Sequence, residues 1–151
     1  MSVGPAILQR NEASRLRLVA LSEQLTSADL ARELPGGWTI SATLAHLAFW
    51  DALDVALLEC WRAGQVPPLE PDWYAGALND AALPTWLLVP PHDATGLALD
   101  AAPAVDAAVA TLEDSIVAAL LARDEAWMVK RYLHRRDHIA QIERAINGQF
   151  G

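Results

Sequence analysis

The chain of 151 residues is 53% hydrophobic and 20% charged, and its formal net charge is −8. This length predicts one domain over residues 1–151, and the apolar content is too high for a disordered chain. Nineteen acidic side chains against eleven Lys and Arg disfavour a nucleic acid as partner, because duplex binding needs a basic face. No window of about 18 residues stays apolar without a charge or a proline, so we expect no membrane span.

The first twenty residues and the cysteine content indicate the compartment. Residues 1–20 lack the basic region and apolar block of a signal peptide, which predicts a cytoplasmic protein. The single cysteine, Cys60, cannot form an internal disulfide, and we expect it to be a buried or half-buried structural thiol.

The N-terminal part of the chain predicts helices. It is rich in Ala and Leu and contains no alternating stretch of strand length, which favours an all-α fold. Residues recur at spacings of three and four over 7–25 and predict a first long helix. Thr26 is placed to cap a short second helical turn, and the Leu-Pro-Gly-Gly run at 34–37 ends it.

A second long helix follows and is predicted to end at about Ala63. Thr39 or Ser41 can cap its N-terminus, and Gly64 is placed to end it. The three prolines within residues 65–72 then predict a loop.

The middle of the chain contains the stretch that is hardest to assign. Residues 73–89 are apolar enough to be helical, but Pro84 interrupts them. Asp93 could cap a third long helix over about 94–112, in which Pro103 predicts a kink or a restart.

The C-terminal part adds two helices. Residues 113–123 predict a short helix, and residues 125–147 predict the last long one, with Gly148 at its C-cap. Four long helices of these lengths, with short extra helices in the connections, predict a four-helix bundle.

Two histidines of the last helix are placed to bind one metal ion. His134 and His138 are one turn apart, about 6 Å along the helix axis, and two imidazoles at this spacing can share an ion. A helical wheel puts them in one stripe with Trp127, Gln141 and Ala145, beside an apolar arc. The pair therefore borders the core.

A third histidine lies on the predicted second helix. His46 shares a stripe with Trp50 and Trp61, which is a buried face, and packing this face on the last helix would bring three imidazoles together. Three neutral histidines leave open positions on an ion, as catalytic sites do. Taken alone, His46 is also explained as a hydrogen-bonded core residue, and His92 as a loop or capping residue.

Three segments resemble the DinB/YfiT-like superfamily of four-helix-bundle proteins. They are Gly-Trp-Thr-Ile at 37–40, Leu-Ala-His-Leu-Ala-Phe-Trp at 44–50 and His-Arg-Arg-Asp-His-Ile-Ala-Gln-Ile at 134–142. The resemblance implies up-down-down-up connectivity and often a dimer. It also implies a divalent metal, often zinc or nickel, held by one histidine of the second helix and an H-x-x-x-H pair of the last.

On the matching positions, the metal ligands implied are His46, His134 and His138. Characterised relatives include thiol-dependent transferases and isomerases that use a low-molecular-weight thiol. The resemblance thus implies a thiol-dependent transferase acting on a small electrophilic molecule. A metal-dependent hydrolase is the second choice. The alternative is a non-catalytic, metal-stabilised bundle that acts as a small-molecule binder or sensor.

Two arginines and two tryptophans are candidates for contact with a substrate. The wheel places Arg135 inside the apolar arc, where its guanidinium needs a partner. That partner is either a carboxylate of the second helix, Asp51 or Asp54, or an anionic thiol or substrate, for which Arg131 is a second candidate.

The tryptophans are Trp38 and Trp50. Both are explained as core mass, and both are also placed to line an apolar substrate pocket beside the metal.

Overall fold

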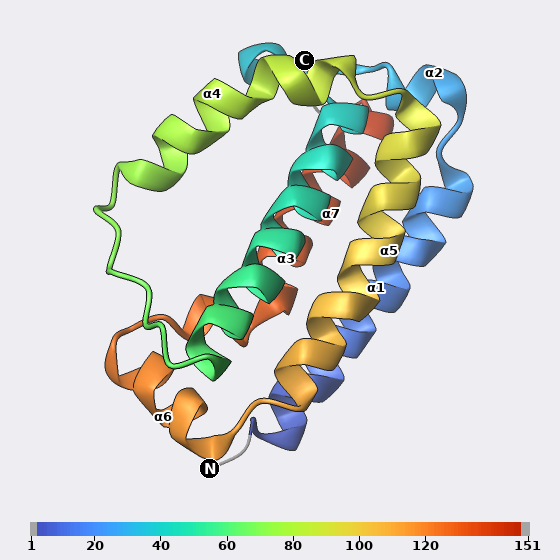
Figure 1. The fold of residues 1–151 in the computed structure, drawn as a ribbon. Helices are drawn as coiled ribbons and strands as arrows, with labels where there is room; N and C mark the ends of the chain where they lie inside the picture. Colours follow the sequence, from blue (N-terminus) through green and yellow to red (C-terminus); the bar gives the residue numbers. More distant parts are fainter. Residues whose placement is uncertain (1–2, 149–151) are drawn as a thin grey trace.

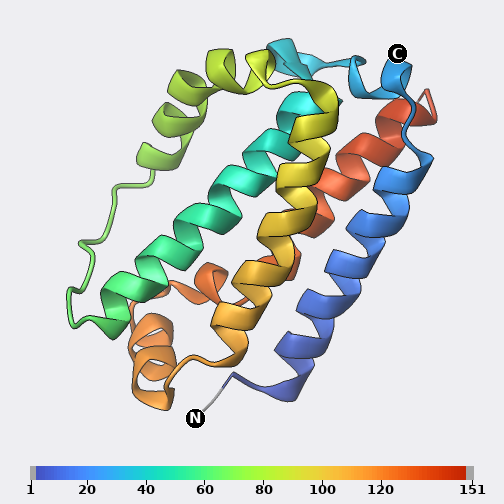
Figure 2. The same ribbon diagram turned by 45° about the vertical axis from the view of Figure 1, so that its right-hand side comes forward.

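The computed structural model of the protein describes residues 3–148. Four helices run side by side: α1 (Pro5–Gln24), α3 (Ile40–Arg62), α5 (Pro91–Ala110) and α7 (Arg131–Ile146) (Figure 1). They form a closed ring of contacts, in which α3 packs on α5 and α7, and α1 packs on the same two helices. α1 and α7 run in one direction, and α3 and α5 run in the other (Figure 2). The predicted all-α class is confirmed.

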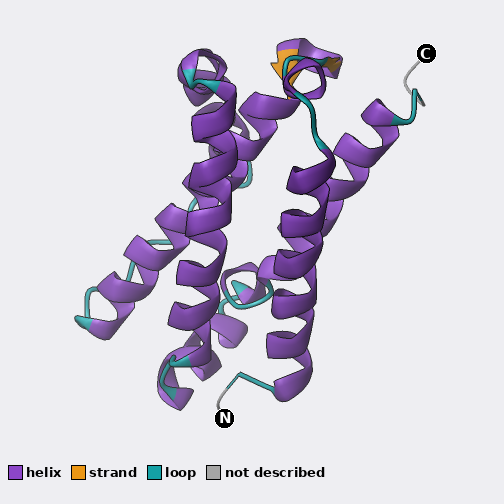
Figure 3. Ribbon diagram, turned by 90° about the vertical axis from the view of Figure 1, so that its right-hand side faces the viewer, coloured by secondary structure: helices purple, strands orange, loops and turns teal. Residues whose placement is uncertain are grey.

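The connection from α1 to α3, in which the sequence predicted no strand, contains four short elements. They are α2 (Ser27–Leu30), β1 (Glu33–Leu34), the 3₁₀ turn η1 (Pro35–Gly37) and β2 (Trp38–Thr39). The strands pair antiparallel, Leu34 opposite Trp38, at the end of the bundle where α3 begins (Figure 3). Two residues are too few to show an alternating pattern. The turn needs positive φ at Gly36 and Gly37, both +81°.

Side-chain caps fix where α2 and α3 begin. Thr26 and Asp29 form a reciprocal capping box on α2. The Thr39 hydroxyl accepts a hydrogen bond from the backbone N–H of Ala42 at 3.0 Å, so Thr39 caps α3, and Ser41 lies inside the helix. The local sequence was therefore sufficient to predict where α2 and α3 begin.

Two predictions about prolines need correction. Residues 73–89 contain a continuous helix, α4 (Tyr74–Leu88), despite Pro84, and its Trp86 side chain is buried against the bundle. α5 continues through Pro103 without a restart, one of the two outcomes predicted there, and it begins at Pro91, ahead of the expected cap. In both helices tertiary packing outweighs the missing backbone donor.

The start of the last helix also differs from the prediction. After α6 (Asp114–Ala122), residues 126–128 form a 3₁₀ turn, η2 (Ala126–Met128), and α7 begins only at Arg131. The cause is Asn11 of α1, which donates to the carbonyl of Val129 at 2.9 Å and accepts from the N–H of Tyr132 at 3.0 Å. A side chain distant in sequence therefore caps α7.

The interior consists of two apolar clusters with a polar layer between them. One cluster includes Leu44 and Leu47 of α3 with Ile139 and Ile142 of α7. The other includes Leu58 of α3 and residues packed around it from α5, α6 and η2. Between them, α3 and α7 bury charged side chains, which belong to the site described below.

One described helix, α3, is long and apolar enough to cross a membrane by length and composition alone. Its most apolar window is 61% buried inside the structure. This burial is expected for the core helix of a soluble protein.

Candidate metal centre

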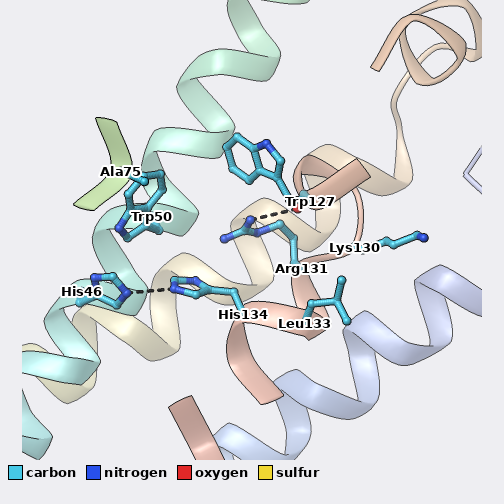
Figure 4. A pocket seen from close by; sticks show the side chains of 8 residues that line it. All are labelled: His46, Trp50, Ala75, Trp127, Lys130, Arg131, Leu133 and His134. Carbon is cyan, nitrogen blue, oxygen red and sulfur yellow. Dashed lines mark hydrogen bonds between the residues drawn. The ribbon is translucent and has the colours of Figure 1, made fainter. Parts of the chain in front are cut away.

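Three imidazoles from α3 and α7 converge at one point. The Nε2 atom of His46 lies 2.9 Å from that of His134 and 3.1 Å from that of His138. One ligand atom from each ring lies within 4.8 Å of the other two, and the group could hold a metal ion. Figure 4 shows His46 and His134 pointing toward each other across the space between the helices. The structure thus brings together the histidines that the sequence predicted would meet, which we call the imidazole cluster.

The nitrogen spacing fits a shared ion. Zinc binds imidazole nitrogen at about 2.0–2.1 Å, so three ligands around one ion lie about 3–3.5 Å apart. The Nδ1 atom of His138 lies 3.1 Å from Oε1 of Gln141. A carbonyl oxygen only accepts, so Nδ1 carries the proton and Nε2 presents its lone pair to the centre. Gln141 therefore orients one of the three ligands.

The cluster is held in the uncharged form. Burial lowers the pKa of His46 to about 3 and that of His134 to about 2, and the neighbouring His138 lowers both further. Burial also lowers the pKa of His138, against the hydrogen bond that its ring donates to Gln141, which raises it. At neutral pH, all three rings are free of a second proton and can ligate a cation.

Aromatic rings surround His46. The ring centroids of Trp86, Trp38 and Trp50 lie 5.1, 5.3 and 6.3 Å from that of His46. Trp86 belongs to α4, the helix that the sequence did not establish, so this neighbour was missed. The surrounding indoles exclude water from one side of the cluster and hold the ring in place.

A cavity of about 230 Å³ opens beside His46 and His134. Trp50, Trp127 and Arg131 line it together with Ala75, Lys130 and Leu133 (Figure 4). Of the four predicted substrate contacts, Trp50 and Arg131 therefore lie in this wall. Trp38 lies against His46 and Trp86, outside the wall. Trp127 lies on η2, not on the helical stripe of the histidines.

The fourth predicted contact, Arg135, is fully buried away from the cavity. Its guanidinium lies 2.8 Å from Asp106 of α5 and 3.4 Å from Asp51 of α3, and it donates to the carbonyls of Asn11 and Ala102. The predicted ion pair with Asp51 is present, and Asp106 was not foreseen. Asp106 lies on α5, and the spacing of residues along the chain cannot show that α5 places it beside Arg135 of α7.

Arg131 has two roles in the structure. Its Nε and one NH2 donate to the same oxygen of Asp51 at 3.1 and 2.9 Å, and its guanidinium also lies over the ring of Trp127. Arg131, Arg135, Asp51, Asp54 and Asp106 form what we call the arginine–aspartate network. It is the polar layer between the two apolar clusters.

Asp54 is the most deeply buried carboxyl group of this network. It is 0% exposed, and its nearest charged partner is Nε of Arg131 at 3.6 Å. Burial raises its pKa to about 8, against the attraction of Arg131. Arg131 and Arg135 pair with Asp51 and Asp106, and the partly exposed Arg15 of α1 also reaches Asp106, at 3.2 Å.

The remaining candidates lie outside the site. His92 is exposed in the first turn of α5, and Cys60 is half-buried on α3 with no second cysteine in the chain.

Comparisons with protein-family models, with curated proteins and with solved structures found no match. The geometry of the site and the sequence motifs therefore carry the functional inference.

Proposed function

We propose that the imidazole cluster binds one divalent cation, zinc or nickel, and that the protein acts on a small electrophilic molecule held in the adjoining cavity. The observation that carries this proposal is the convergence of three uncharged Nε2 atoms within bonding range of a single ion. Three neutral ligands leave the cation its full charge and at least one open position.

Such a cation supplies Lewis acidity, which lowers the pKa of a water or thiol ligand toward neutrality. The residues of the chain provide the rest. Gln141 orients His138, the indoles exclude bulk water, and Trp50 and Trp127 offer apolar faces to the substrate. We propose a thiol-dependent transferase first and a metal-dependent hydrolase second.

The DinB-like four-helix bundle is part of this proposal. The motifs around His46 and His134 support it, as do the opposite directions of the helix pairs α1/α7 and α3/α5. A homodimer and a low-molecular-weight thiol as co-substrate follow from the same resemblance. A cytoplasmic location is proposed from the sequence alone.

Metal analysis of freshly purified protein tests the proposal. We expect about one equivalent of zinc or nickel per chain, lost in His134→Ala and retained in His92→Ala, which changes an exposed histidine. Absence of metal from protein purified without chelators would contradict the site.

Activity is then measured with a panel of electrophiles and esters, each with and without added thiol. Turnover that needs the thiol supports the transferase, and turnover without it supports the hydrolase. Bound metal without any turnover, together with a lower melting temperature of His46→Ala, favours the non-catalytic binder or sensor.

A further inference from the structure

A second and larger cavity adjoins the metal centre. Its volume is about 670 Å³, and it shares Trp50, Ala75 and Trp127 with the smaller cavity beside His46. Its walls come from α3, from residues 67–78 and from residues 123–128, and we call it the outer chamber. The two cavities therefore adjoin at Trp50, Ala75 and Trp127.

The outer chamber is elongated along α3. Trp50, Leu53, Leu57 and Trp61 line it at spacings of three and four residues, so they form one stripe of the helix. The twelve residues from the first to the last of them span about 16 Å along the helix axis. A compact ligand would leave most of this stripe uncovered, whereas an extended apolar chain would cover it.

Arg123 holds the outer wall in place. Its guanidinium donates to the carbonyl of Pro67 at 2.7 Å and lies 5.1 Å from the ring of Trp61. The contact ties the proline-rich connection between α3 and α4 to the loop after α6. The chamber is therefore a built cavity with a tethered wall and not a chance gap between helices.

The charges around the chamber are mainly negative. Its charged lining residues are Glu70, Asp72, Arg123, Asp124 and Glu125. Arg123 and Glu125 neutralise each other in an ion pair of 2.7 Å. The other three carboxylates have no ion-pair partner among residues 3–148, so they give the chamber an uncompensated negative field.

We propose that the outer chamber binds the non-reacting part of the substrate, and that this part is an extended apolar chain carrying a positive charge, as in a long-chain amine. The carboxylates attract the cation, and the faces of Trp50, Trp127 and Tyr74 are suited to contact with it. An anionic end is repelled. The role of this group as part of a substrate rests on the proposed function, but its binding needs neither metal nor turnover.

Three probes of equal chain length test the charge preference. Decylamine, decanol and decanoate are titrated below their micelle concentrations, and binding is followed by tryptophan fluorescence and calorimetry. We expect decylamine to bind about tenfold more tightly than decanoate at low salt, with decanol between them, and the preference to shrink as salt rises. Equal affinities, or a preference for decanoate, would overturn the proposal.

Matched variants test the place of binding. Leu57→Trp fills the chamber and should weaken decylamine binding at least about tenfold, whereas Leu97→Trp, at an exposed leucine of α5 outside the chamber, should not change it. Equal binding by both variants would overturn the proposal.

The role of the chamber carboxylates is tested with substitutions at exposed positions, which should not affect folding. The double variant Glu70→Gln/Asp72→Asn should remove most of the preference for decylamine over decanoate, and Asp80→Asn, an exposed acid of α4 outside the chamber, should retain it. An unchanged preference in the double variant would overturn the role of these carboxylates.

The last comparison separates this proposal from that of the metal site. His134→Ala should lose metal and bind decylamine as the wild type does. Wild-type protein that holds metal but binds no decylamine overturns the chamber proposal alone, and protein that binds decylamine but never metal overturns only the metal site. Affinity that falls as the protein dimerises would show that a second copy covers the chamber, and this too overturns the proposal.

Discussion

α3 and α7 carry two buried polar clusters that are satisfied in different ways. In the arginine–aspartate network, each guanidinium has carboxylate partners inside the protein, and burial raises the pKa of Asp54. In the imidazole cluster, the Nε2 atoms of three uncharged rings face one another, and Gln141 supplies a partner on the far side of one ring. In the first cluster the charged groups form ion pairs, although both carboxyl oxygens of Asp54 and Nε of Arg135 have no hydrogen-bond partner among the described residues. The second cluster has no charged group to pair, and its ring nitrogens can ligate a cation.

This comparison distinguishes buried polar groups that stabilise the fold from buried polar groups that can bind a ligand. Buried polar groups are nearly always paired. A buried ion pair fixes how two helices pack against each other and leaves no charged group free to bind another molecule. The three ring nitrogens that face one another beside a cavity have no charged partner among the described residues and can hold a cation. Burial alone therefore does not mark a site; unsatisfied chemistry next to accessible volume does.

The largest expected effect comes from breaking the completed cluster. Arg135→Ala leaves Asp106 and Asp51 without their shared partner, and we expect a loss of about 3–5 kcal/mol in the free energy of unfolding, measured by urea denaturation. Arg136→Ala, which removes an exposed arginine paired with exposed Asp137, should change it by less than about 0.5 kcal/mol. Small and equal losses in both variants would show that the network contributes no stability.

The next effect concerns the incomplete cluster. Zinc at about 100 times its dissociation constant should stabilise the wild type by about 3 kcal/mol, because only the folded chain brings the three rings together. Thermal unfolding with and without a chelator measures this difference. His138→Ala should show no response to zinc, whereas His92→Ala should respond like the wild type. A response that persists in His138→Ala would place the metal elsewhere.

A smaller effect tests the proton on Asp54. Its raised pKa, about 8, means that the folded protein keeps a proton that the unfolded chain releases near pH 4. Wild-type stability from this group is therefore present at low pH and is lost as pH rises toward 8. Asp54→Asn cannot ionise, so relative to wild type it should gain about 2 kcal/mol between pH 6.5 and pH 8.5.

Urea denaturation across this pH range measures the gain. Asp137→Asn, at an exposed acid of α7, is the control and should show a flat difference from wild type. A flat difference for Asp54→Asn as well would mean that Asp54 is ionised in the folded state.

The smallest effect concerns the orientation of a ligand. Gln141→Leu removes the acceptor for Nδ1 of His138, and we expect about tenfold weaker zinc binding in a competition titration. Gln24→Leu, at an exposed position of α1, should bind zinc like the wild type. Equal affinities in the two variants would remove Gln141 from the site.

Much of the fold was predictable because its signals are local. The spacing of apolar residues predicted α1 and α3 to within a few residues, and Thr39 marked the start of α3. The H-x-x-x-H spacing placed His134 and His138 on one helix face. The stripe around His46 identified its side of α3 as buried.

The features that the sequence did not predict all depend on contacts between residues that are distant in the chain. α7 begins at Arg131 because Asn11 of α1 occupies the backbone groups before it. Trp86 reaches His46 because α4 folds back on the start of α3, and Asp106 meets Arg135 from a third helix. None of these contacts has a signature in the local sequence, since each joins residues separated by one or more elements.

The amino-acid sequence by itself determined most of the helical segments, the apolar faces of the long helices and which side chains could ligate a cation. These properties depend on residues within one or two turns of each other. The tertiary structure alone decided that the three imidazoles face one another while the arginines meet carboxylates. The physical reason is that pairing of buried groups depends on how distant helices pack, and the free energy of burying a polar group is settled only when its partner is in place.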